Sequence, residues 1–135
     1  MNPLIVVFLT EEEVEDLHRV ALEEFGGGLP GTRDGGLLSS AVASPQASFG
    51  GEFMFEDLFE MAAALLWHIA RNHAFVDGNK RTATASALVF LALNGVEIEP
   101  TGHGLLYEIT LAAAEGKATQ EEVAEALRRA YRASN

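Results

Sequence analysis

The sequence predicts an all-α fold, a helical bundle with a central pair of buried helices and a polar loop held between them. Residues 56–72 and 80–94 are apolar nearly all round, which is typical of helices that are covered on every side. The capping-box pattern of a helix N-terminus, Thr-x-x-Glu, occurs twice, at Thr10 and at Thr119. At 135 residues the chain is long enough to bury a core of its own, and we expect one domain over residues 1–135.

Shorter helices are expected on both sides of the central pair. The apolar periodicity and the end signals place them at 10–25, 37–43, 104–114 and 119–131. Residues 26–36 are rich in glycine and are expected to form a loop, in which Arg33 and Asp34 pair with each other or cap the next helix. That next helix should end before Pro45. Residues 46–55 contain serine, glycine and phenylalanine and show no helical stripe.

The stretch between the two central helices concentrates polar and charged side chains. This motif runs His73-Ala74-Phe75-Val76-Asp77-Gly78-Asn79-Lys80-Arg81. Gly78 can adopt a positive φ angle, which lets the chain turn sharply before a helix that begins near Lys80. The first N–H groups of that helix lack intrahelical partners and, together with Lys80 and Arg81, suit an anion such as phosphate. The sequence therefore predicts phosphate binding by Gly78, Asn79, Lys80 and Arg81.

Three further side chains of the motif suggest chemistry. Histidine titrates close to neutral pH, so His73 can take a proton from an attacking hydroxyl. Asp77 can hold a Mg2+ ion that bridges phosphate oxygens. Phe75 is expected to anchor the motif in the core.

Two other interpretations of the motif stay open at this point. Its histidine and its aspartate could be a helix cap and a turn residue. A zinc site could instead use His68, His73 and Asp77, although His68 and His73 do not share a helix face and no cysteine assists.

Charge and composition restrict the class of partner. The formal net charge is -11, which argues against a general nucleic-acid binder, because such proteins show a basic face. Arg71, Lys80 and Arg81 nevertheless fall close together, which favours a small anionic ligand. The chain has no cysteine, no recognisable signal peptide and no apolar run long enough to cross a bilayer, so we expect a cytoplasmic protein.

The motif resembles the signature of the Fic/Doc superfamily, whose Fic branch has the pattern H-x-F-x-[DE]-G-N-G-R-x-x-R. Six positions match: His73, Phe75, Asp77, Gly78, Asn79 and Arg81. Lys80 stands where that pattern has its second glycine, and Thr84 stands where it has its last arginine. Both departures are typical of the Doc (death-on-curing) toxin branch, in which N-K-R-T-A follows the acid. Residues 29–38 and 44–46 also resemble Doc proteins.

The resemblance implies a Fic-like helical bundle and a nucleotide-dependent transferase. For the Doc branch it implies a toxin that uses ATP and Mg2+ to phosphorylate a Ser/Thr hydroxyl of translation elongation factor Tu and arrests translation. The implied roles are general base for His73, Mg2+ ligand for Asp77, and phosphate binding for Asn79, Lys80, Arg81 and the loop amides. Protein AMP transfer by the same groups is the alternative, and a non-catalytic binding module is a second one.

The resemblance also implies protein partners. Doc toxins are held by a separate antitoxin, and we expect a Phd-like one here because the inhibitory pattern [ST]-x-x-x-E-[GN] of many Fic proteins is missing. In Fic-like folds the region of residues 46–55 forms a flap that lines the target peptide. Phe49, Phe53 and Phe55 could therefore face a partner, although we expect at least two of them to pack in the core.

Overall fold

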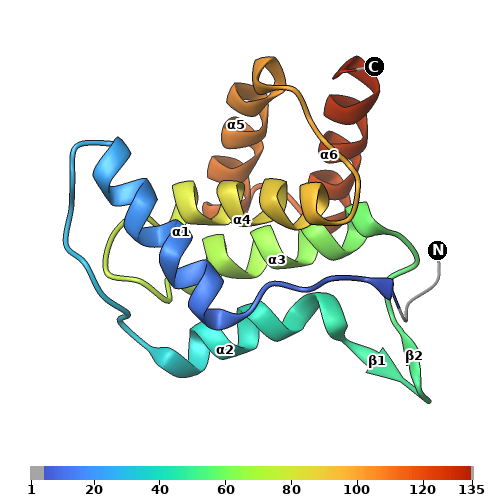
Figure 1. Ribbon diagram of the computed structural model, residues 1–135, viewed down its shortest axis with the longest axis horizontal. Coiled ribbons are helices and arrows are strands. Elements are labelled where there is room, and N and C mark those ends of the chain that lie inside the picture. The colour runs from blue at the N-terminus through green and yellow to red at the C-terminus, as the bar shows by residue number, and fades with distance from the viewer. Residues whose placement is uncertain (1–4, 135) are drawn as a thin grey trace.

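A computed structural model describes residues 5–134, which form six α-helices and one short hairpin (Figure 1). The helices are α1 (Glu11–Glu24), α2 (Gly35–Ala43), α3 (Leu58–Asn72), α4 (Asn79–Leu93), α5 (His103–Ala114) and α6 (Gln120–Ser134). The hairpin pairs β1 (Ser48–Phe49) with β2 (Glu52–Phe53) in antiparallel register, and two single turns of 3-10 helix are η2 (Ser44–Gln46) and η3 (Pro100–Gly102).

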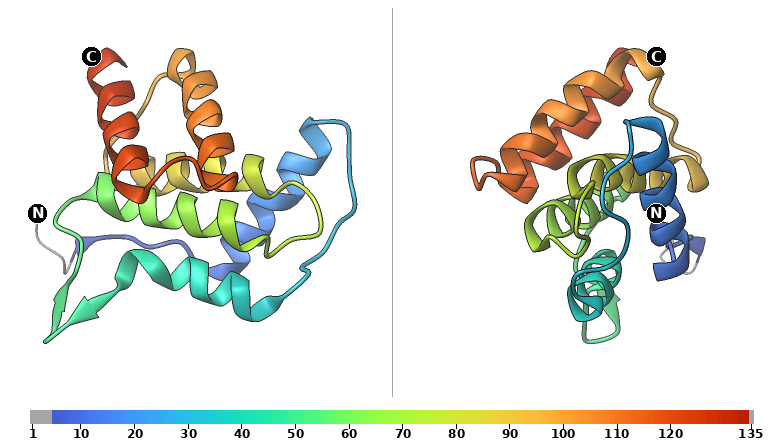
Figure 2. Two further views of the ribbon diagram at one scale, coloured as in Figure 1. Left: turned by 180° about the vertical axis from the view of Figure 1, so that it is seen from behind. Right: turned by 90° about the vertical axis from the view of Figure 1, so that its left-hand side faces the viewer.

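Helix α3 is the centre of the bundle. It packs against α2, α4, α5 and α6, and α4 is in turn covered by α1 and α5. Figure 1 shows α3 and α4 side by side, with α1 crossing them and α2 below, while Figure 2 shows α5 and α6 together at one end of the molecule. The buried side chains of the described chain form one cluster to which all six helices contribute. The predicted all-α bundle with a central buried helix pair is therefore confirmed.

Local capping explains where the helices begin. The capping boxes predicted at Thr10 and Thr119 are both formed, because each threonine hydroxyl accepts from the backbone N–H three residues later and each glutamate accepts in return. Asp34 accepts from the first backbone N–H groups of α2, so this helix begins at Gly35 rather than at residue 37. Asp57 caps α3 in the same way, so α3 begins at residue 58 rather than 56.

The segment between α2 and α3 contains the hairpin. Gly50 and Gly51 form its turn with φ angles of 61° and 85°. Phe53 and Phe55 pack against the core cluster, whereas Phe49 is 87 % exposed. The prediction that at least two of these phenylalanines would be core residues is confirmed. No helix within residues 5–134 is long and apolar enough to span a bilayer.

Candidate active site

The motif loop, residues 73–78, connects α3 to α4 and has a left-handed residue at each end. His73 ends α3 with φ 51°, a conformation that is unfavourable for a non-glycine residue. Gly78 has φ 78° and precedes the first residue of α4. A Cβ atom at Gly78 would lie 3.1 Å from Cδ2 of Leu22, so the position favours glycine for both its backbone angle and its space.

The side chain of Asn79 binds the backbone of the motif loop in the interior of the protein. Its Nδ2 donates to the carbonyl of Phe75 at 2.9 Å, and its Oδ1 accepts from the N–H of Phe75 at 3.0 Å. Both residues are buried, with exposed fractions of 7 % for Asn79 and 1 % for Phe75. Because the side-chain amide is used on the loop itself, the group of Asn79 that stays available for the predicted phosphate is its backbone N–H in the first turn of α4.

The glycine-rich segment between α1 and α2 wraps the loop from outside. The N–H of Leu29 donates to Oδ2 of Asp77 at 2.9 Å. Arg33 donates from Nε to the carbonyl of His73 at 2.7 Å, and from Nη2 to the carbonyl of Asn72 at 3.0 Å. The expectation for Asp34 is confirmed by its cap on α2, but the one for Arg33 is wrong. Arg33 instead binds the last carbonyls of α3, where the negative end of the helix dipole attracts a cation.

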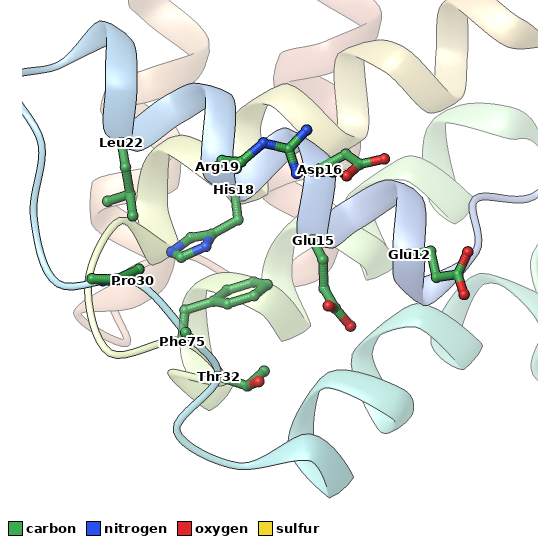
Figure 3. A pocket seen from close by; sticks show the side chains of 10 residues that line it. Glu12, Glu15, Asp16, His18, Arg19, Leu22, Pro30, Thr32 and Phe75 are labelled. Atoms are coloured by element: carbon green, nitrogen blue, oxygen red, sulfur yellow. Dashed lines mark hydrogen bonds and ion pairs between the residues drawn. The ribbon is translucent and has the colours of Figure 1, made fainter.

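His18 on α1 supports the loop from the third side. Its Nε2 donates to the carbonyl of Asp77 at 2.7 Å, and its ring stacks on that of Phe75 with centroids 3.9 Å apart (Figure 3). The side chain is 4 % exposed. His18 was not predicted from the sequence, because one histidine on an amphipathic helix belongs to no motif. Its spacing from Val14 and Ala21, which puts it on the buried stripe of α1, was the available signal.

The side chains of His73 and Asp77 remain open to solvent. Within residues 5–134, the imidazole of His73 makes no hydrogen bond, and the Asp77 carboxylate uses only Oδ2. The backbone carbonyls of both residues are held by neighbouring side chains, as described above. The loop is thus fixed through its backbone while an imidazole and a carboxylate oxygen face outward.

The cations of the protein are unevenly distributed around this loop. The chain has 9 Lys and Arg against 20 Asp and Glu. Five cations of the described chain make ion pairs with carboxylates: Arg19, Lys117, Arg128, Arg129 and Arg132. The four others lie in the motif, bind it or precede it in sequence: Arg33, Arg71, Lys80 and Arg81. Arg33, Lys80 and Arg81 thus leave positive charge at this loop of an acidic protein, which favours an anion there, whereas the guanidinium of Arg71 lies over the ring of Trp67 at 5.5 Å.

Comparison with known proteins assigns the chain to a family. A family model described as Fic/DOC matches residues 8–91, which include α1 to α3, the motif and most of α4. The chain belongs to the Fic/DOC family. "Toxin Doc" of Mycolicibacterium smegmatis is 50 % identical over 91 residues, or 67 % of each chain. "Protein kinase doc" of Escherichia phage P1 is 40 % identical over 123 residues, or 91 % of this chain and 94 % of that protein.

The two departures of this Fic/DOC domain from the Fic pattern lie one helical turn apart on α4. Thr84 is buried, and its hydroxyl lies 2.8 Å from that of Thr110 on α5 and donates to the carbonyl of Lys80 at 3.1 Å. The position of the last Fic arginine therefore belongs to the α4–α5 contact. Lys80 is half-buried and makes no ion pair in the described chain.

A zinc centre in this Fic/DOC domain finds no support in the geometry. No three His, Asp or Glu side chains within residues 5–134 are close enough to hold a metal ion together. His68 instead meets the ring of Trp67 edge-on at 5.1 Å, and burial lowers the pKa of His68 below its usual 6.5. A lone exposed carboxylate such as that of Asp77 suits Mg2+, which commonly keeps several waters and takes its other ligands from phosphates.

A hollow of about 410 Å3 lies between α1 and the glycine-rich segment, and the ring of Phe75 forms part of its lining (Figure 3). Its rim carries three carboxylates, those of Glu12, Glu15 and Asp16, while its one arginine is already paired with Asp16. A phosphate group would be repelled there. The anion site is therefore expected at the first turn of α4 and not in this hollow.

Proposed function

We propose that this protein is a Doc-like toxin that transfers the γ-phosphate of ATP to a Ser/Thr hydroxyl of a protein, with translation elongation factor Tu as its target. The observation that carries the proposal is the 40 % identity to the protein kinase of phage P1 over 91 % of the chain. The unpaired cations around the motif loop are consistent with an ATP substrate. Phosphorylation of the factor would arrest translation and hence growth.

The groups of the loop have complementary parts in this reaction. The hydroxyl oxygen of the target attacks the γ-phosphorus, its proton goes to the exposed imidazole of His73, and the bond to the β–γ bridging oxygen breaks to release ADP. Lys80, Arg81 and the first backbone N–H groups of α4, from Gly78 and Asn79 onward, bind the phosphates. Asp77 would hold Mg2+, which neutralises charge on the phosphate oxygens when bound. Its carboxylate is already oriented by the N–H of Leu29.

Phosphate transfer is preferred over AMP transfer because of two side chains. In the Fic pattern a glycine follows the asparagine and lets the phosphates lie against the loop. Lys80 fills this space with a long cationic side chain, and Thr84 replaces the last arginine with a hydroxyl that is used on α5. The nucleotide is therefore expected to bind in another pose, with its γ-phosphate nearest His73.

A toxin of this kind requires a separate inhibitor. We propose a Phd-like antitoxin as the partner that keeps the host cell alive. Wild-type protein expressed alone is then expected to stop growth, whereas the His73→Ala variant should not. Equal growth of the two strains would contradict the toxin role.

Intact-mass spectrometry tests the reaction and its target together. Purified elongation factor Tu is incubated with this protein, ATP and Mg2+, with His73→Ala as the control enzyme. A gain of one phosphate that the variant does not produce is the expected result, and a gain of AMP would support the alternative transferase reaction. No gain would contradict the proposed target and favour a binding module.

A further inference from the structure

The guanidinium of Arg81 lies between two aromatic rings. Its Cζ is 3.9 Å from the ring centroid of Phe25 and 3.9 Å from that of Tyr107. Both distances are well inside the range of about 6 Å over which a cation is attracted to the face of a ring. Such stacking is available to arginine because its guanidinium is flat.

The two rings restrict how Arg81 can be used. All N–H groups of a guanidinium point outward in its plane, so contacts of its central carbon with ring faces leave its N–H groups available for hydrogen bonds. Within residues 5–134, Arg81 makes neither an ion pair nor a side-chain hydrogen bond. The two rings attract the cation but carry no opposing charge, so the positive charge of Arg81 is retained. This differs from Arg128, whose guanidinium is 3.0 Å from Oδ2 of Asp57.

The rings come from elements that carry no residue of the motif. Phe25 is the C-cap residue of α1 and directly precedes the glycine-rich segment that binds Asp77. Tyr107 lies on the second turn of α5. Helices α1 and α5 both pack against α4, which carries Arg81 in its first turn (Figure 1). Most arginines of this chain are held by a carboxylate. The side chain of Arg81 is instead oriented by rings from two neighbouring elements.

We infer that Phe25 and Tyr107 form an aromatic clamp that positions Arg81 for in-plane hydrogen bonds to a phosphate group of the nucleotide. The inference rests on the proposed function, because it assigns the two rings to the same anion site. Without the clamp, the flexible arginine would have to be ordered by the ligand itself, which costs binding free energy. Phe25 and Tyr107 are therefore positioning residues and need not touch the nucleotide.

The test is the dissociation constant of ATP, measured by isothermal titration calorimetry in the presence of Mg2+ on the full-length protein. Tyr107→Leu keeps an apolar side chain but removes the ring, and it is expected to weaken ATP binding by about 3- to 10-fold. Tyr107→Phe keeps the ring and removes only the hydroxyl, so it should bind ATP as the wild type does. Phe25→Leu is expected to behave like Tyr107→Leu.

A double-mutant cycle separates the clamp from a general effect on the fold. In an Arg81→Ala background the two rings have no guanidinium to hold, so Tyr107→Leu should cause no further loss of ATP affinity. An equal loss in both backgrounds would overturn the clamp, and so would unchanged ATP affinity of Tyr107→Leu in the wild-type background. If the wild-type protein bound no ATP, the proposed function would fail together with the clamp, an outcome distinct from both of these.

Discussion

The two buried hydrogen bonds of Asn79 should make this residue important for stability as well as for the site. Asn79→Ala removes both bonds and leaves the N–H and C=O of Phe75 buried without partners. Leaving one buried polar group unsatisfied costs about 1–3 kcal/mol. For two groups, with some relaxation of the loop, we expect the free energy of unfolding to fall by about 2–4 kcal/mol. This is a large fraction of the roughly 5–15 kcal/mol that stabilises a typical domain.

Asn94 provides a matched control for this substitution at the other end of α4. Its amide also bonds both backbone groups of one residue, because Oδ1 accepts from the N–H of Val7 at 2.8 Å and Nδ2 donates to its carbonyl at 2.9 Å. Nδ2 donates in addition to the carbonyl of Phe90 at 2.8 Å. The contact with Val7 is exposed and the one with Phe90 is only partly buried, so water can replace the lost bonds, and Asn94→Ala should cost only about 0.5–1.5 kcal/mol. Urea unfolding followed by circular dichroism measures both variants. Asn94→Ala costing as much as Asn79→Ala would refute the argument from burial.

Three further changes have expected outcomes. Gly78→Ala should lower the free energy of unfolding by about 1–3 kcal/mol, and by more than Gly95→Ala does. Both glycines have a positive φ angle, 78° and 85°, but only a Cβ at Gly78 would lie against Leu22; urea titration of the two variants checks this ordering. The pKa of His68 in the folded state is below its usual 6.5, so the unfolded chain binds more protons and stability should fall as the pH drops below about 6.5. The melting temperature of the wild type should therefore fall more steeply with decreasing pH than that of His68→Gln, and equal slopes would exclude this cause. His18→Leu retains apolar bulk but loses the bond to the motif-loop carbonyl, so a cost of about 1–2 kcal/mol is expected in the same urea assay, and none if that bond is unimportant.

Local signals in the sequence were sufficient for the helices. Thr10 and Thr119 each sit three residues before a glutamate, and a capping box depends on nothing outside that turn. The central pair was predictable because α3 and α4 are apolar on all sides. The start of α3 was misplaced by two residues, because Asp57 was not recognised as its cap.

The architecture of the site depended on contacts between distant residues. Arg33 binds the carbonyl of His73, which is 40 positions away, and His18 binds that of Asp77, 59 positions away. No short pattern encodes such pairs, since each requires α1 and the glycine-rich segment to be folded onto the loop. The motif itself was visible because its polar residues are contiguous. The functional roles of His73, Asp77, Lys80 and Arg81 remain predictions.

Transfer of the γ-phosphate is tested most directly by following which phosphate of ATP becomes attached to a protein. The wild-type protein and the His73→Ala variant are each incubated with Mg2+ and a bacterial lysate containing ATP labelled either at the γ-phosphate or at the α-phosphate. We predict one protein band, of the size of elongation factor Tu, that is labelled only from the γ position and only by the wild-type protein. Label that enters a protein from the α position and not from the γ position would contradict phosphate transfer.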